Sequence, residues 1–220
     1  TKVIDIGCGE GFSLDYFSKK NWDVLGVDFT SDGIKRHFPD LEKKMRVGDI
    51  FLSLDSLIAE GQTFGLILCN NVLEHVLDPK LLLEKIKKLS TRNSLLRLQL
   101  PNDNSWLQNL IVKSAFAEEN YWFCPPAHLN YFNGRQFETF VTNLGLKVND
   151  VLGDFPIELY LLNPTSNYKK NAAVGKAAHE ARILFETTLA RKSMHDFIAF
   201  KRGCGQSGTC RNTTLYCSLK

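Results

Sequence analysis

The sequence predicts an α/β protein with a doubly wound, mostly parallel sheet. Three observations carry this prediction: β-branched apolar runs alternate with amphipathic stretches, several runs end in polar residues, and the first run leads into a glycine-rich turn. Strands of a parallel sheet are covered by helices on both faces, so they form continuous apolar runs. We expect seven strands, with the last one antiparallel.

The expected elements alternate along the chain. The strands are predicted at residues 3–6, 24–27, 45–47, 64–69, 94–100, 147–152 and 212–219. The helices are predicted at residues 13–20, 31–37, 79–89, 134–144 and 172–192. The helix at 79–89 has the clearest signal, because its apolar and charged positions repeat with a helical period. Gly145 is a helix C-cap signal that ends the helix before it.

Composition is that of an ordinary globular protein. With 44% hydrophobic and 23% charged residues, the chain can bury a full core, and we expect one domain over residues 1–220. The six cysteines lack zinc spacing, so no metal is expected. No apolar run is long enough for a membrane span and no signal peptide precedes the first strand, which predicts a cytoplasmic protein. Since the chain begins directly on a strand, we expect a further segment upstream.

The glycine turn carries the first functional signal. Gly7, Gly9 and Gly11 alternate with other residues, a spacing one residue tighter than that of dinucleotide-binding turns. Glycine permits positive φ angles and lets the backbone approach a ligand closely. The next strand ends in Asp28, which in a right-handed βαβ unit lies beside this turn and can accept both hydroxyls of a ribose. The turn therefore predicts a nucleotide-like ligand.

Polar residues also end other expected strands. Asp5, Asp28, Asp49 and the pair Asn70 and Asn71 all fall at carboxyl ends, where ligands bind in open parallel sheets. Any one of these residues can instead cap the following helix. Four such positions together favour a ligand site at this edge.

These motifs resemble those of the class I S-adenosylmethionine-dependent methyltransferases, whose fold is Rossmann-like. The resemblance covers about residues 1–150 and lies in four ordered segments, at 3–11, 27–28, 48–50 and 70–76. It implies S-adenosyl-L-methionine as cofactor. The implied reaction is methyl transfer to a small-molecule acceptor, on an oxygen of a sugar or other metabolite.

The resemblance also implies a role for each motif residue. Asp5 would meet the amino group of the methionine part, and Asp28 the ribose hydroxyls. Phe29 would flank the adenine, and Asp49 would accept from its exocyclic amine. The other implied cofactor contacts are Gly7, Cys8, Gly9, Gly11, Ile50, Asn70 and Asn71.

Two histidines are candidate catalytic residues, because a hydroxyl acceptor needs a base. His75 follows the strand at 64–69, in a triplet that is often structural in the resembling family. His128 lies in residues 102–133, a connection longer than usual loops, which we interpret as an active-site cover. An apolar cradle for a ring is expected there from Trp106, Tyr121, Trp122, Phe123, Tyr131 and Phe132. Alternatively, the segment forms a satellite core in which His128 bonds to backbone.

A basic helical insertion is expected at residues 153–208, before the last strand. Residues 161–220 hold ten lysines and arginines against three acids. This excess fits a solvated surface, a phosphorylated or sugar-nucleotide substrate, RNA, or self-association as a homodimer. Residues 163–182 and 203–219 also loosely resemble methyltransferases of bacterial surface-polysaccharide synthesis.

Two other functions stay open. An NAD-dependent oxidoreductase or epimerase would use the same sheet with a longer glycine turn. A non-catalytic protein would bind the cofactor only to regulate a partner. Neither a membrane nor nucleic acid is expected as the main partner.

Overall fold

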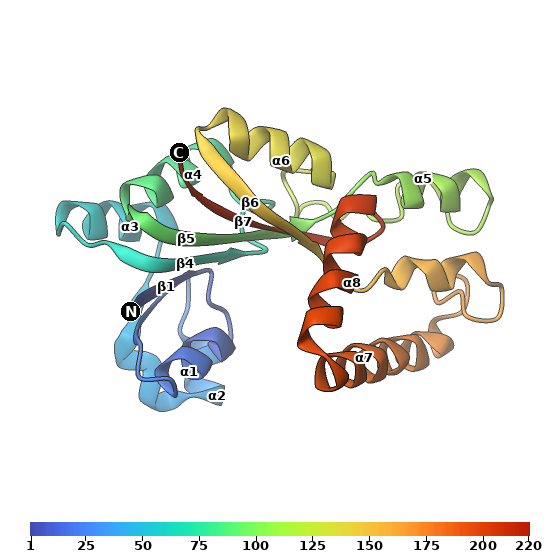
Figure 1. Cartoon of the computed structure of the whole chain (residues 1–220), viewed down its shortest axis with the longest axis horizontal. Helices are drawn as coiled ribbons and strands as arrows, with labels where there is room; N and C mark the ends of the chain where they lie inside the picture. Colours follow the sequence, from blue (N-terminus) through green and yellow to red (C-terminus); the bar gives the residue numbers. More distant parts are fainter. The chain divides into compact units, whose positions relative to one another are not determined.

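A single seven-stranded sheet organises the chain. The computed structural model describes all residues from 1 to 220 (Figure 1). The strands are β1 (Lys2–Ile6), β2 (Asp23–Asp28), β3 (Met45–Val47), β4 (Phe64–Asn70), β5 (Ser90–Pro101), β6 (Leu146–Gly153) and β7 (Asn212–Leu219). Their order in the sheet is β3-β2-β1-β4-β5-β7-β6. The first five strands pair in parallel, and antiparallel strands close the C-terminal end. The predicted fold class is confirmed.

Eight α-helices connect the strands. They are α1 (Phe12–Ser18), α2 (Asp32–His37), α3 (Ile50–Ala59), α4 (Pro79–Lys88), α5 (Trp106–Lys113), α6 (Gly134–Asn143), α7 (Gly175–Lys192) and α8 (Met194–Ser207). Three 3-10 turns are η1 (Pro39–Lys44), η2 (Ile157–Leu162) and η3 (Ala172–Val174). The five predicted helices are present, and the helix expected at 172–192 begins as η3 and continues as α7.

Three helices were not predicted, namely α3, α5 and α8. Each begins at a side-chain cap. The carboxylate of Asp49 accepts from the Leu52 amide, Ser105 and Gln108 form a capping box, and Ser193 accepts from the Asp196 amide. Such caps satisfy amides that have no partner inside the helix.

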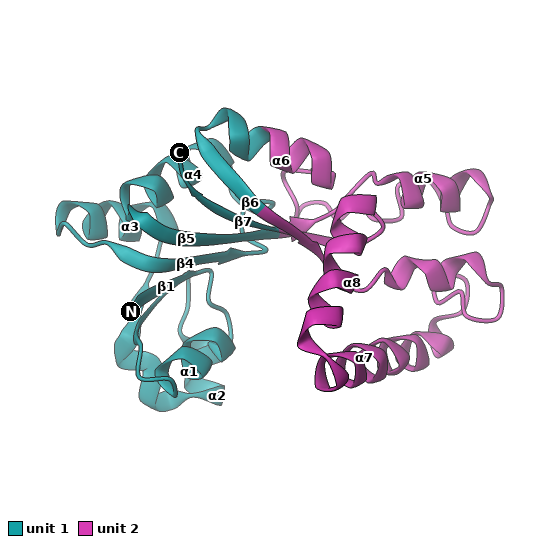
Figure 2. Cartoon of the chain, in the orientation of Figure 1, with its two compact units in different colours: residues 1–99, 140–149, 215–220 teal, residues 100–139, 150–214 magenta.

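The chain divides into two compact units (Figure 2). Unit 1 comprises residues 1–99, 140–149 and 215–220, and unit 2 comprises residues 100–139 and 150–214. Strands β5, β6 and β7 each contribute residues to both units. The two units are described separately below.

The core of unit 1 lies between the sheet and the first helices. Val3 on β1 pairs with Val24 on β2, and both pack with Leu14 of α1 and Ile34 of α2 in one buried cluster. Burying such side chains is worth roughly 1.5–3 kcal/mol each. This cluster fixes α1 directly after the glycine turn, and therefore fixes the turn itself.

Unit 2 has its own buried cluster. Leu107 and Ile111 of α5 pack against Leu161 of η2, with Phe116 at the edge. The side-chain amide of Asn167, which is fully buried, donates to the carbonyls of Phe116 and Leu161 at 2.7 and 2.9 Å. Residues 102–133 and 153–208, which appear as separate features in the sequence, therefore share one core.

None of the helices in the chain has the length and apolar character needed to cross a membrane.

Candidate functional site

The turn after β1 has the backbone conformation that its glycines permit. Gly7, Gly9 and Gly11 have φ angles of 72°, 53° and 82°. The Gly7 amide donates to the carbonyl of Val27 at 2.7 Å, and the Gly9 amide donates to Oδ2 of Asp28 at 2.8 Å. The turn is therefore tied to the end of β2, as the βαβ geometry predicts.

The three glycines differ in what surrounds them. A Cβ atom at Gly7 would collide with Val72, and one at Gly11 would lie 2.6 Å from the Ile34 side chain. A Cβ atom at Gly9 would have no neighbour within 4 Å. Gly7 and Gly11 thus serve close packing, whereas Gly9 leaves open space above the turn.

A cavity of about 450 Å³ opens beside this turn, wholly within unit 1. Its volume falls in the range of small-molecule sites, which is roughly 300–1,000 Å³. Six residues implied by the resemblance line it: Gly7, Asp28, Phe29, Asp49, Ile50 and Asn71. Phe51, Val72, His75, Val76 and Leu77 complete its wall. The residues at the ends of β1, β2 and β4 thus meet at one cavity.

The acidic groups at this cavity have different local roles. Oδ2 of Asp28 is bound to the Gly9 amide, which leaves its second oxygen for a ligand. Oδ1 of Asp49 accepts from the Leu52 amide at 3.0 Å, so Asp49 caps α3 while it lines the cavity. Phe29 exposes 64% of its surface and presents its ring beside them.

Asp5 lies beneath the turn rather than on the cavity wall. Its side chain is only 3% exposed, and burial raises its pKa from 3.8 to about 7, against the opposing effects of a Ser13 hydrogen bond and the Arg97 charge. Burial disfavours the ionised form because water no longer solvates the charge. Asp5 is therefore a group whose charge changes near neutral pH.

This shift predicts a pH-dependent stability. Between pH 3.8 and about 7 the folded state holds the Asp5 proton more tightly than the unfolded state, so stability falls as pH rises through this window. The loss should be on the order of a few kcal/mol and level off above pH 7. The free energy of unfolding, measured with urea, should differ less between pH 5 and pH 8 for Asp5→Asn than for the wild type. The surface variant Asp40→Asn should show the same difference between the two pH values as the wild type. If the free energy of unfolding changes equally between the two pH values in Asp5→Asn and in the wild type, Asp5 is not the source of the pH dependence.

Asn70 lies in a group of polar side chains on β4 and β5. The sequence analysis identified Asn70 but not its partners Arg97 and Gln99. Arg97 of β5 donates to Oδ1 of Asn70 and, at 2.7 Å, to Oε1 of Gln99. Arg97 and Gln99 alternate with buried leucines along β5. This two-residue period was the signal in the sequence that both side chains share one face of the strand. Asn71, at φ 54°, lies on the cavity wall.

Cys8 serves packing. Its thiol is buried 3.4 Å from the sulfur of Met45, and burial raises its pKa to about 12. A neutral thiol of this kind behaves as a small apolar side chain. Cys8 can therefore contribute to a ligand only through its backbone.

The two candidate histidines line different cavities. His75 lines the cavity of unit 1 with its side chain 44% exposed, and its Nε2 lies 3.8 Å from Oε1 of the buried Glu74. His128 lines a second cavity, of about 440 Å³, within unit 2. The His128 amide donates to the carbonyl of Cys124 at 2.9 Å, which orients its backbone.

The aromatic cradle is smaller than predicted. Tyr121, Trp122 and Phe123 line the cavity with His128. Trp106 belongs to α5, where its indole donates to the carbonyl of Ser207 at 2.5 Å and the ring lines another part of unit 2. Helix formation at 106–113 carries this side chain away, so it is not part of the cradle.

Tyr131 and Phe132 also lie outside the wall of this cavity. Tyr131 stacks on Phe123, with ring centroids 4.8 Å apart, and its hydroxyl donates to the carbonyl of His128 at 3.1 Å. Phe132 packs against Phe137 of α6. Tyr131 therefore supports the cradle from behind.

Comparisons with known proteins identify the family of the chain. Residues 1–151 match the family model of a methyltransferase domain. The chain is 29% identical to the ubiquinone biosynthesis O-methyltransferase of Glaesserella parasuis over 122 residues, which is 52% of this chain and 51% of the relative. It is 24% identical to the mitochondrial enzyme of that name from Bos taurus over 191 residues, 81% of this chain and 49% of the relative. The chain spans about half the length of the curated relatives it matches.

Solved structures share the fold. A SAM-dependent methyltransferase from Archaeoglobus fulgidus superposes with a TM-score of 0.57 at 20% identity, covering 99% of this chain and 85% of that one. PKMT2 from Rickettsia typhi in complex with AdoHcy gives a TM-score of 0.55 at 18% identity, covering 99% of this chain and 48% of that one. Since the matched residues 1–151 include the glycine turn and every strand end that forms the cavity of unit 1, the chain belongs to the S-adenosylmethionine-dependent methyltransferase family, as its motifs predicted, and S-adenosyl-L-methionine is its cofactor.

Proposed function

We propose that this chain transfers the methyl group of S-adenosylmethionine to an oxygen of a small-molecule acceptor, a sugar or another hydroxylated metabolite. The cavity of unit 1 is the observation that carries the proposal, because Gly7 of the glycine turn and the Asp28 carboxylate both line it, and Asp28 also accepts from the Gly9 amide. The names of the curated relatives favour oxygen as the methylated atom.

The residues of this cavity fit a nucleoside. Gly9 leaves the space in which a ribose can approach the backbone, and Asp28 has one carboxylate oxygen available for its hydroxyls. The exposed ring of Phe29 offers a face for the adenine, and the buried Ile50 offers an apolar contact. No lysine of the phosphate-binding type follows Gly11, which agrees with a cofactor that lacks phosphate.

The mechanism assigns few tasks to the chain. When bound, the cofactor supplies a methyl group on a cationic sulfur, which an acceptor oxygen can attack. Asp28 and the glycine turn would hold the donor, because alignment of the reactants is the main requirement. His128 would accept the proton of the acceptor hydroxyl, and His75 would contact the donor side.

Isothermal titration calorimetry tests the donor. We expect S-adenosylhomocysteine to bind and NAD not to bind, and we expect transfer of labelled methyl groups to hydroxylated acceptors. Binding of NAD alone would instead identify an oxidoreductase or epimerase. Cofactor binding without transfer to any acceptor in cell extracts would favour the regulatory alternative. A cytoplasmic location and a homodimer stay predictions.

The glycine turn supplies a matched pair of variants. Gly9 and Gly61 both have positive φ, at 53° and 66°, and neither position would bring a Cβ atom within 4 Å of a neighbour. Gly9→Ala and Gly61→Ala should therefore each lose about 1–2 kcal/mol of stability from backbone strain. Only Gly9→Ala should weaken S-adenosylhomocysteine binding in calorimetry, because its methyl group points into the open space. Equal affinities for the two variants would show that the ligand lies elsewhere.

A further inference from the structure

The cavity of unit 2 has two chemically different walls. Tyr121, Trp122 and Phe123 supply aromatic rings from the connection before α6. Glu158, Lys169 and Arg211 supply charged groups from the segment after β6. Small-molecule sites combine apolar walls with a few placed polar groups in this manner.

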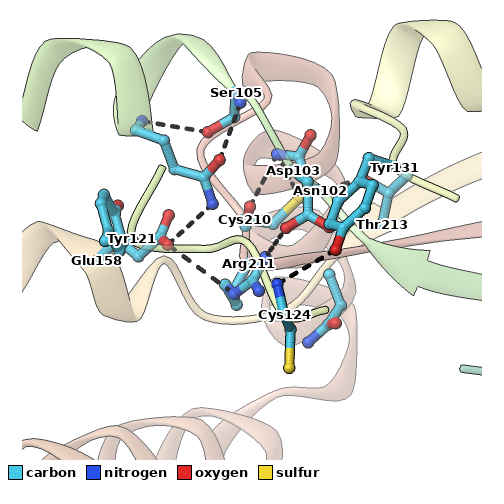
Figure 3. Close-up of polar contacts among 12 residues, drawn as sticks. Asn102, Asp103, Ser105, Tyr121, Cys124, Tyr131, Glu158, Cys210, Arg211 and Thr213 are labelled. Carbon is cyan, nitrogen blue, oxygen red and sulfur yellow. Dashed lines mark hydrogen bonds and ion pairs between the residues drawn. The ribbon is translucent and has the colours of Figure 1, made fainter. Parts of the chain in front are cut away.

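Arg211 is held rigidly at this cavity. Its guanidinium donates to Oδ1 of the buried Asp103 at 2.7 Å and lies 3.9 Å from Oε1 of Glu158 (Figure 3). Its backbone amide donates to Asp154 at 2.8 Å, and its carbonyl accepts from the Asn102 amide at 2.8 Å. Both the main chain and the side chain of Arg211 are therefore fixed before any ligand arrives.

Glu158 and Tyr121 leave hydrogen-bonding capacity beside Arg211. Glu158 is 2% exposed, and its Oε1 accepts from the side-chain amide of Gln108 at 3.0 Å. The other carboxylate oxygen and the phenol oxygen of Tyr121, which lies next to it in Figure 3, are buried and interact with each other, but neither atom has a hydrogen bond of regular geometry. Buried polar atoms with poor hydrogen-bond geometry gain from a ligand group that completes their hydrogen bonds. A hydroxyl group, which both donates and accepts, could pair with both after a small side-chain movement.

Lys169 supplies a positive charge without a carboxylate partner. Its ammonium lies 5.5 Å from the centre of the Tyr121 ring and 3.5 Å from the Tyr121 carbonyl, and it forms no ion pair. Oδ1 of Asn167 accepts from the Lys169 amide at 3.1 Å, so the residue is held at the cavity from a fully buried anchor. An anionic group of a ligand is the natural partner for this charge.

We propose that the cavity of unit 2 binds a hydroxylated ring that carries an anionic group, such as a sugar phosphate or a uronic acid. The aromatic wall would contact the face of the ring, Glu158 and Tyr121 its hydroxyls, and Lys169 the anionic group. The inference rests on the proposed function, in which this compound is the methyl acceptor.

Binding of simple probes to the whole chain tests this assignment. Glucose 1-phosphate and glucuronate are titrated separately, with glucose as the neutral ring and benzoate as an anionic ring without hydroxyls. We expect both anionic sugars to bind about tenfold more tightly than glucose, because a charge-assisted contact is worth about this much. The sugar that binds more tightly shows whether the cavity prefers a phosphate or a carboxylate as the anionic group. Preferred binding of benzoate, or no binding of any sugar, would overturn the proposal.

A matched pair of lysines locates the site. Lys169→Met should remove the preference for anionic sugars over glucose. Lys170→Met should keep it, because the Lys170 ammonium donates to the Ala115 carbonyl and lies over the Phe116 ring, away from the wall of the cavity. Equal effects of the two variants would overturn the proposal. S-adenosylhomocysteine binding is measured on the same samples. If the wild-type protein does not bind S-adenosylhomocysteine, the proposed donor is wrong. If it binds S-adenosylhomocysteine but no sugar, only the proposed acceptor site is wrong.

Discussion

Replacing His128 by alanine should lower the turnover number by about 100-fold, the usual contribution of a general base. The reason is the position of this residue in the cavity of unit 2, beside the aromatic rings and the charged wall. Affinity for S-adenosylhomocysteine should stay unchanged, because the residues proposed to hold the donor lie in unit 1. Single-turnover kinetics with labelled donor and calorimetry of the product measure the two effects separately.

His195→Ala is the control for this variant. The side chain of His195 is 91% exposed on α8, and its loss should change neither turnover nor binding. His75→Ala should raise the Michaelis constant for the donor more than it lowers turnover, since His75 lines the cavity of unit 1 that is proposed to hold the donor. A turnover for His128→Ala within a few-fold of the wild type would remove His128 from the role of base.

Replacing Asp28 by alanine should weaken S-adenosylhomocysteine binding by about 100-fold, since two hydrogen bonds to a charged acceptor are lost. The same carboxylate also accepts from the Gly9 amide at 2.8 Å, so the alanine variant loosens the turn as well. Asp28→Asn separates the two contributions. Its amide oxygen can still accept from Gly9, while the charge on the ribose side is gone.

Asp23→Ala is the control at the opposite end of the same strand. Asp23 pairs with Lys44 at 3.2 Å on the surface, so its loss should leave cofactor affinity unchanged. We expect the affinity of Asp28→Asn to lie between those of Asp28→Ala and the wild type. Wild-type affinity in Asp28→Ala would show that the nucleoside does not meet this carboxylate.

The parts of the fold that local patterns determine were predictable. Strands β1, β2 and β4 are short apolar runs bounded by polar or glycine residues. All five strands from β1 to β5 were predicted within a few residues of their observed bounds. Helix α3 was missed because the ligand role of Asp49 was favoured over the alternative that it caps a following helix, and it does cap α3. Helix α5 was missed because its capping box lies inside a connection interpreted as an irregular cover.

The cavity of unit 2 shows where sequence reasoning stopped. Its aromatic wall lies in one contiguous segment, and all three rings, those of Tyr121, Trp122 and Phe123, were predicted. Glu158, Lys169 and Arg211 lie 37 to 90 residues away from Tyr121 in the chain, and only tertiary packing brings them beside it. In the sequence Lys169 and Arg211 appear only as part of the basic region at residues 161–220, and Glu158 precedes that region. Arg97 was missed for a similar reason, since its partner Asn70 lies on another strand.

The division of three strands between the units has a consequence for engineering. Unit 2 is made of two stretches, residues 100–139 and 150–214, that interrupt unit 1 at two points in the chain. No single cut can release either unit as an uninterrupted polypeptide. Transplanting the proposed acceptor site of a homologue onto unit 1 would require exchanging both stretches together, because residues of both stretches line the cavity of unit 2.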